Sequence, residues 1–265
     1  MSKVQSMMWA LGRHIVMRDQ KGQVLTVIEY PKGGGTWVAK CLATSLNLPF
    51  VGSGKFLPLI PCVIRTHWRP DPKLAPGVLV VRDPRDVMVS LFHHRARNIN
   101  RTPVRRKQFE ELFGEVISPE KIQEQLSGFI ELEFEDPRYG AHQNWSDYAK
   151  DAAAAVGNSG GRIKVVKYED MVSTPVTTLQ SVLSELGYEV PEGIVKLTND
   201  LHDKKWGDKK YSSASDETTF IRTGKSGGWA DVFDFAARRS LHNWCGEQMI
   251  ELGYEDSDDW LNAGL

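Results

Sequence analysis

The stretch Thr26–Leu46, TVIEYPKGGGTWVAKCLATSL, combines a strand, a glycine-rich turn and a helix. β-Branched and apolar residues from Val24 to Ile28 predict the strand, and apolar or small residues at near-helical spacing from Trp37 onward predict the helix. The glycines at 33–35 allow a sharp turn and the close approach of a ligand to the backbone. The first amides of the helix point into this turn, where the helix dipole favours an anion. The stretch therefore predicts a phosphate-binding loop.

The residue order in this loop differs from the two common phosphate-binding signatures. Lys32 supplies a positive charge and Thr36 a hydroxyl, but the Walker signature places its lysine after the last glycine, not before the first. The dinucleotide-binding signature also fails, because three consecutive glycines lack its spacing. A glycine-rich turn that binds nothing is the alternative, and the rest of the chain has to decide between the two.

Composition limits the class of protein. A chain of 265 residues, 41% hydrophobic and 25% charged, is long enough for one α/β domain with its own core. The formal charge of −1 argues against nucleic acid as a partner. Cys41, Cys62 and Cys245 are too few and too far apart for a disulfide framework or a zinc site, and they indicate a reducing compartment, the cytoplasm. No apolar run reaches the ~20 residues of a transmembrane helix.

Two further strands are each followed by a polar residue that can carry chemistry. The apolar segment from Cys62 runs into His67, at the strand end where open α/β sheets bind their ligands. The second apolar strand, Gly77–Val81, is followed by Arg82 and by a helix with good starting residues, Asp83 as the cap and Pro84 in the first turn. An arginine and a helix hydroxyl at this spacing suit a phosphate group.

These segments, taken in order, resemble the cytosolic-type sulfotransferases. Tyr30–Trp37, YPKGGGTW, is similar to the family's YPKSGTTW loop, which binds the 5′-phosphosulfate of 3′-phosphoadenosine-5′-phosphosulfate (PAPS). Arg65–His67 resembles the start of the KTHLP stretch, and Arg82–Ser90 resembles the 3′-phosphate motif. Tyr168–Met171 matches a YEDM segment, and Phe220–Trp229 matches the FxRKGxxGxW segment that closes over the 3′-phosphate.

The resemblance implies roles for individual residues. His67 corresponds to the catalytic base, and Lys32 and Arg65 are the other implied catalytic residues, Arg65 standing where the family has a lysine. Thr223 also replaces a lysine of the family. The implied nucleotide-binding residues are Lys32, Gly33, Gly34, Gly35, Thr36, Trp37, Arg82, Ser90, Tyr168, Arg222, Thr223 and Gly224. No metal is required, and the sequence shows no ligand cluster for one.

Pattern and resemblance together predict the fold. We expect a single sulfotransferase domain over residues 1–265, an α/β fold with three layers, α/β/α, around a mostly parallel central sheet of the P-loop NTPase-like type. Residues 1–22, rich in Met and Trp, are expected to form a helical extension. Residues 197–228 are polar and lysine-rich, and we expect a lid over the nucleotide there.

The implied function is PAPS-dependent sulfotransfer. The sulfuryl group moves in line to a hydroxyl or amine of a small-molecule acceptor and PAP is released; His67 takes the proton, and Lys32 and the loop amides stabilise the leaving phosphate. The acceptor class stays open between phenol, alcohol, sugar, lipid and amine. Two other functions stay open as well. A P-loop-like nucleotide phosphotransferase (kinase) should carry a Walker lysine, and a non-catalytic PAP-binding module should tolerate the loss of Lys32 or His67.

Overall fold

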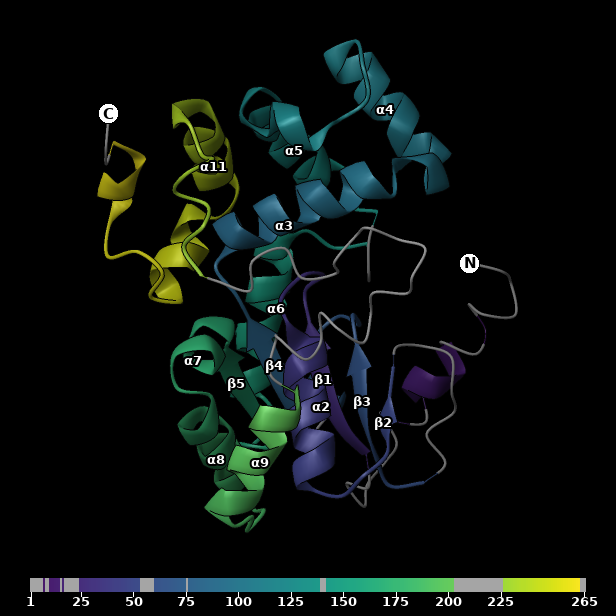
Figure 1. Ribbon diagram of the computed structural model, residues 1–265, viewed down its shortest axis with the longest axis vertical. Coiled ribbons are helices and arrows are strands. Elements are labelled where there is room, and N and C mark those ends of the chain that lie inside the picture. The colour runs from purple at the N-terminus through teal and green to yellow at the C-terminus, as the bar shows by residue number, and fades with distance from the viewer. Residues whose placement is uncertain are drawn as a thin grey trace. The chain divides into compact units, whose positions relative to one another are not determined.

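The computed structural model describes residues 7, 10–14, 16, 24–52, 60–74, 76–138, 142–202 and 226–262. The chain falls into two compact units, Met1–Arg82 with Tyr148–Ile221, and Asp83–Asp147 with Arg222–Leu265. The first unit holds the sheet and the glycine-rich loop, and the described part of the second unit is helical (Figure 1). The organisation of residues 1–265 as a single domain stays a prediction.

The first unit is built on a five-stranded parallel sheet with the strand order β2-β3-β1-β4-β5. Val27 of β1 lies opposite Arg65 of β3 and Val78 of β4, which defines the register. The strands are β1 (Val24–Glu29), β2 (Phe50–Val51), β3 (Cys62–Thr66), β4 (Gly77–Val81) and β5 (Ile163–Lys167). Because all pairs are parallel, the carboxyl ends of the strands meet at one edge of the sheet, where such folds bind their ligands.

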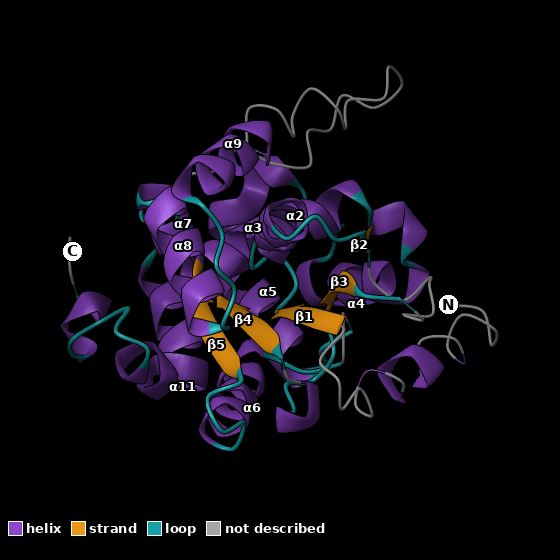
Figure 2. Ribbon diagram, turned by 90° about the horizontal axis from the view of Figure 1, so that it is seen from below, coloured by secondary structure: helices purple, strands orange, loops and turns teal. Residues whose placement is uncertain are grey.

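Helices cover both faces of this sheet, with α2, α8 and α9 on one face and α6 on the other (Figure 2). The predicted three-layer α/β/α fold is confirmed. The helical elements of the unit are α2 (Gly35–Ser45), α6 (Trp145–Gly157, its first turn assigned to the second unit), α7 (Tyr168–Ser173), α8 (Pro175–Glu185), α9 (Glu192–His202) and the 3₁₀ turn η1 (Pro72–Leu74).

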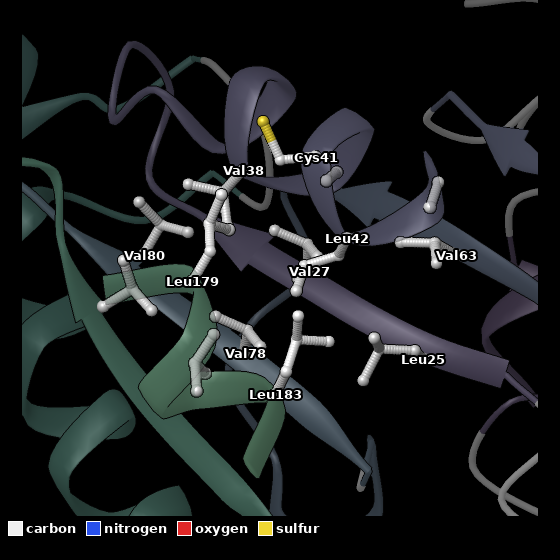
Figure 3. Close-up of a cluster of buried hydrophobic side chains, with 14 of the residues drawn as sticks. Leu25, Val27, Val38, Cys41, Leu42, Val63, Val78, Val80, Leu179 and Leu183 are labelled. Atoms are coloured by element: carbon white, nitrogen blue, oxygen red, sulfur yellow. The ribbon is translucent and has the colours of Figure 1, made fainter. Parts of the chain in front are cut away.

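The hydrophobic core of the first unit lies between the sheet and the helices α2 and α8. Figure 3 labels members of this cluster: Leu25 and Val27 from β1, Val78 and Val80 from β4, Val63 from β3, Val38, Cys41 and Leu42 from α2, and Leu179 and Leu183 from α8. Every residue of β1 and β4 is buried, as expected for central parallel strands covered on both faces.

The second unit packs aromatic rings between its helices. Phe129 lies 5.1 Å from Phe92 and 5.8 Å from Phe109, measured between ring centroids. Glu133, almost fully buried, accepts hydrogen bonds from Nε of Arg95 at 3.0 Å and lies 3.3 Å from Nη2 of Arg105. The elements are α3 (Pro84–Arg97), η2 (Ile99–Arg101), α4 (Pro103–Phe113), η3 (Pro119–Lys121), α5 (Ile122–Glu135), α11 (Phe235–Glu251) and η4 (Asp258–Leu261).

Two predicted segments, the lid over residues 197–228 and the N-terminal extension over residues 1–22, lie partly outside the described residues, and both stay predictions. Residues 197–202, expected to begin the lid, are the end of α9. Val195 and Thr198 of that helix are buried, and Val195 joins the core, so packing overrides the polar sequence. Residues 203–225 lie outside the described part of the chain. Of the predicted N-terminal extension, residues 10–14 are helical. Within the described residues, no helix has the length and apolar character needed to cross a membrane.

Candidate active site

The glycine-rich loop leaves β1 at Glu29 and enters α2 at Gly35. Two of its residues adopt left-handed backbone conformations, Lys32 with φ 72° and Gly34 with φ 90°. A Cβ atom on Gly34 would lie 2.3 Å from Cδ2 of Tyr168, so a side chain cannot be placed there without displacing the ring. Glycine at position 34 is therefore needed both for its backbone conformation and for the close approach of Tyr168.

The loop amides divide into two groups. The amide of Gly33 donates to the Tyr30 carbonyl at 2.9 Å, and the amide of Gly35 donates to Oε2 of Glu29 at 2.5 Å. In the described part of the chain, no hydrogen bond uses the amides of Gly34 and Thr36. Two of the four amides at positions 33–36 are thus satisfied within the chain, those of Gly33 and Gly35.

Glu29, the last residue of β1, was not singled out by the sequence. Its side chain is buried, and its Oε1 accepts a hydrogen bond from Nη1 of Arg65 at 3.0 Å. A Cβ atom on Gly35 would lie 2.8 Å from the carboxyl carbon, so the third glycine of the loop makes room for this carboxylate. The sequence feature that could have identified Glu29 is its carboxylate at the end of a buried strand, a place where apolar residues otherwise prevail.

His67 follows β3 and has both ring nitrogens engaged. Nδ1 lies 3.1 Å from the backbone carbonyl oxygen of Glu29, and Nε2 lies 2.8 Å from Nη1 of Arg65. An arginine guanidinium has donors and no acceptor, so Nε2 must be the acceptor of that bond. The ring proton is therefore on Nδ1, which donates to the Glu29 carbonyl, and the lone pair is on Nε2. This is a neutral imidazole with the electronic arrangement of a base.

The electrostatic surroundings of His67 favour the neutral ring. Burial is the largest influence and lowers the pKa of His67 below its ordinary value. The carboxylate and carbonyl of Glu29 act in the opposite direction and raise the pKa, whereas the positive charges of Arg65 and Lys32 lower it. The net effect keeps the lone pair on Nε2 unprotonated at neutral pH.

Arg82 and Tyr168 support the loop from the neighbouring strands. Arg82 follows β4 and donates from Nη1 to the Lys32 carbonyl at 3.1 Å. Its guanidinium carbon lies 4.3 Å from the centroid of the Tyr168 ring, a cation–π contact. Tyr168, which opens α7, also meets the edge of Trp37, with 6.2 Å between centroids. The fold thus brings together five of the predicted residues, Lys32, Gly34, Trp37, Arg82 and Tyr168.

Gly33, Gly35 and Thr36 belong to the same loop, whereas Ser90 belongs to the second unit, where it lies half-buried on α3. Arg222, Thr223 and Gly224 lie outside the described residues. Just after them, the amides of Gly227 and Trp229 donate to the carboxylate of Asp86 at 2.8 and 3.2 Å. No group of three or more metal-binding side chains occurs among the residues that the structure describes.

Comparison with known proteins identifies the family. The model of the sulfotransferase domain family matches residues 61–253, well over half of the chain. The chain belongs to the sulfotransferase family. The same match identifies it as an enzyme of this family. The matched range includes His67, Arg82, Ser90 and Tyr168. The glycine-rich loop precedes it, so its assignment rests on the YPKGGGTW motif and on the geometry above.

Individual sulfotransferases share the length and the fold. Sulfotransferase 1 family member D1 of Mus musculus is 22% identical over 279 residues, covering 86% of this chain and 85% of the relative. The crystal structure of mouse sulfotransferase SULT7A1 complexed with PAP superposes with a TM-score of 0.66, at 18% identity, over 98% of this chain and 96% of that one. Retinol dehydratase in complex with androsterone and PAP gives a TM-score of 0.64 at 16% identity, over 86% of this chain and 81% of that one.

Proposed function

We propose that this sulfotransferase moves the sulfuryl group of PAPS to a hydroxyl or amine of a small molecule, with His67 as the general base. The observation that carries the proposal is the protonation state deduced for His67, a neutral ring with its lone pair on Nε2. Two relatives of known structure were crystallised with PAP, which supports PAPS as the donor here.

The loop supplies the site for the 5′-phosphosulfate. Lys32 and the amides of Gly34 and Thr36 would hold the phosphate that becomes the leaving group, and the dipole of α2 adds to their field. Arg82, Ser90 and the segment 222–224 would hold the 3′-phosphate, which an ATP-dependent enzyme does not need to bind. Tyr168 would act on the nucleotide side through its packing against the loop and Arg82.

The proposed chemistry is a single in-line displacement. The acceptor oxygen or nitrogen forms a bond to sulfur while the bond between sulfur and the bridging phosphate oxygen breaks, and that oxygen keeps the electron pair. The acceptor proton passes to Nε2 of His67, giving an imidazolium ion. Negative charge grows on the departing phosphate, where Lys32 and the amides stabilise it. Positioning and charge stabilisation do the work, and no metal is needed in this scheme.

The acceptor is proposed only by class. Retinol dehydratase structures contain androsterone and retinol, both apolar molecules that carry a hydroxyl group. We therefore place apolar alcohols and phenols first in an acceptor screen, followed by sugars and amines. A cytoplasmic location stays a prediction; all three cysteines are buried free thiols, as a reducing compartment would allow.

The two alternatives make different predictions for ligand binding. A kinase-like phosphotransferase should bind ADP with Mg²⁺, but Lys32 precedes the glycines, unlike a Walker lysine. A non-catalytic PAP-binding module would bind PAP but would need no base. Such a module should tolerate the loss of Lys32 or His67, and both residues are present in this chain. The position of the ring nitrogens beside the loop favours the enzyme.

The experiment that separates the proposal from a kinase compares the thermal stability of the full chain with PAP, ADP-Mg²⁺ and NAD at equal concentration, and the transfer assay of His67→Ala described in the Discussion separates it from a non-catalytic module. A ligand at ~100 times its Kd should stabilise the folded state by ~2.7 kcal/mol. We expect a shift with PAP only, its loss in Lys32→Ala, and its retention in Lys107→Ala, a change of an exposed lysine on α4. A shift with ADP-Mg²⁺ and none with PAP would contradict the proposal and favour the kinase.

A further inference from the structure

Glu29 is a buried charge of the first unit that the proposed mechanism does not use. Its carboxylate binds two partners from different parts of the chain, the Gly35 amide at the start of α2 and Nη1 of Arg65 on β3. Its backbone carbonyl accepts from Nδ1 of His67. A single residue thus touches the loop, the arginine and the ring of the base.

The burial of this carboxylate needs a reason. An unpaired carboxylate in a protein interior is strongly unfavourable, and even a paired one is often no more stable than apolar residues of similar volume. Apolar side chains fill the other positions of β1, apart from Thr26, so a stable strand end needs no carboxylate. A role in placing neighbouring groups explains why one is present.

One nitrogen of Arg65 contacts both Glu29 and His67. Nη1 of Arg65 lies 3.0 Å from Oε1 of Glu29 and 2.8 Å from Nε2 of His67, so the same nitrogen serves the carboxylate and the base. We propose that Glu29 is a positioning residue for sulfuryl transfer, holding Arg65 at the ring so that His67 rests as the Nδ1–H tautomer with Nε2 as acceptor. This inference rests on the proposed function, because it assumes that Nε2 is the atom that takes the proton.

The shared nitrogen also indicates what happens during the reaction. Nε2 cannot take the proton of the substrate hydroxyl or amine while it accepts a hydrogen bond from Arg65, so Nη1 has to move away from the ring. Oε1 of Glu29 is the partner that Nη1 keeps when it does so. The proton then lies on Nε2, and the imidazolium ion is stabilised by the nearby carboxylate of Glu29.

The charged groups that face His67 have opposite influences, and this makes the proposal testable. Glu29 faces it from β1, Arg65 from β3 and Lys32 from the loop. The phenol of Tyr148 on α6 faces Glu29 in turn, and its hydroxyl donates to the carbonyls of Ile28 and Val80 at 3.2 Å each. Removing the carboxylate should lower the pKa of His67, whereas removing the guanidinium should raise it.

The experiment is a titration of the histidine side chains by NMR in the full chain, with the His67 signals assigned from their loss in His67→Gln. We expect wild-type His67 to titrate as the Nδ1–H tautomer, Glu29→Gln to move its midpoint to lower pH, and Arg65→Met to move it to higher pH. The two nearby charges alone would produce these midpoint shifts, so the tautomer is the readout that tests positioning: Glu29→Gln, which no longer holds Arg65 at the ring, should show a mixture of the Nδ1–H and Nε2–H tautomers. Two shifts of the same sign, or an Nε2–H tautomer in the wild type, would overturn the proposal.

Matched controls exist in the second unit, in the buried pair of Glu133 with Arg95. Glu133→Gln and Arg95→Met should leave the His67 midpoint and tautomer unchanged. The double variant Glu29→Gln with Arg65→Met removes both charges together and leaves neither of them unpaired, so it can be measured if one of the single variants fails to fold. Its His67 midpoint should lie between the midpoints of the two single variants. None of these readouts needs an acceptor, and PAP-dependent stabilisation of the wild type tests the proposed function separately.

Discussion

Arg82 donates a hydrogen bond from Nη1 to the backbone carbonyl of Lys32, the residue of the glycine-rich loop that has a left-handed conformation without being glycine. Such a conformation is unfavourable for a residue with a side chain and persists only where its surroundings hold it. Arg82 therefore has two predicted roles, a direct contact with the 3′-phosphate and the support of the loop that binds the 5′-phosphate.

We expect Arg82→Lys to weaken PAP binding by about tenfold, because lysine keeps the charge but loses the planar fork and the contact with the Tyr168 ring. Isothermal titration calorimetry with PAP measures the change. Arg106→Lys, which alters an exposed arginine of α4 paired with Glu110, is the control and should bind PAP as the wild type does. Equal affinity of Arg82→Lys and wild type would remove Arg82 from the site.

Gly34→Ala should destabilise the fold by about 2 kcal/mol or more, because the new methyl group would meet Tyr168 and the left-handed backbone would be strained. For a chain of this size that is a fall in Tm of roughly 4–8 °C, measurable by calorimetry. Gly157→Ala is the control: its Cβ points into open space at the end of α6, so the Tm should stay level or rise slightly.

The two causes of this loss can be separated by a double-mutant cycle. In a Tyr168→Ala background the clash disappears while the backbone strain remains, so Gly34→Ala should cost less there than in the wild type, but still more than zero. Identical costs in both backgrounds would mean that the Tyr168 ring does not constrain Gly34.

The sequence predicted the elements whose signals are local. A run of β-branched and apolar residues located β1, the three glycines located the loop, and the helical spacing of apolar residues located α2. Asp83 was predicted as the cap of α3, where it accepts a hydrogen bond from the Arg85 amide at 2.9 Å. Position at a strand end and the family motif drew attention to His67. These features depend on residues within a few positions of one another, which is the range over which propensity and capping act.

Features that depend on distant partners could not be predicted. Arg95 and Arg105 belong to a strongly basic segment, yet both are buried because Glu133 on α5 pairs with them. The proposed role of Glu29 depends on its ion pair with Arg65, and the two residues lie next to each other only because β1 pairs with β3. In each case the partner is nearly 30 residues away or more, and only the tertiary structure selects it.

His67→Ala should reduce sulfuryl transfer by about 10²–10⁴-fold, the usual contribution of a general base, while PAP binding stays within a factor of about two. Initial rates with PAPS and the best acceptor of the screen give the first number, and calorimetry gives the second. His242→Ala, on α11 of the second unit, is the control and should transfer at the wild-type rate. Wild-type rates in His67→Ala would exclude His67 as the base.

The pH dependence of transfer should reflect the lowered pKa of His67. The base acts only when neutral, and burial keeps it neutral at pH values where an ordinary histidine is already protonated. We therefore expect kcat/KM for PAPS transfer to fall with decreasing pH along a curve whose midpoint lies below pH 6.5, the ordinary pKa of histidine. A midpoint above pH 6.5 would mean that the ring is not held neutral or that another group is the base.

The same shift makes stability depend on pH. Below about pH 6.5, the ordinary pKa of histidine, the unfolded chain binds a proton at His67 that the folded chain does not, so the folded state loses stability as the pH falls toward its own lower pKa. Other groups also titrate there, so the contribution of His67 is read as a difference. The gap in Tm between wild type and His67→Gln should change in favour of the variant between pH 7.5 and pH 5.5. A gap that stays constant across this range would show that the pKa of His67 is the same in the folded and unfolded chains.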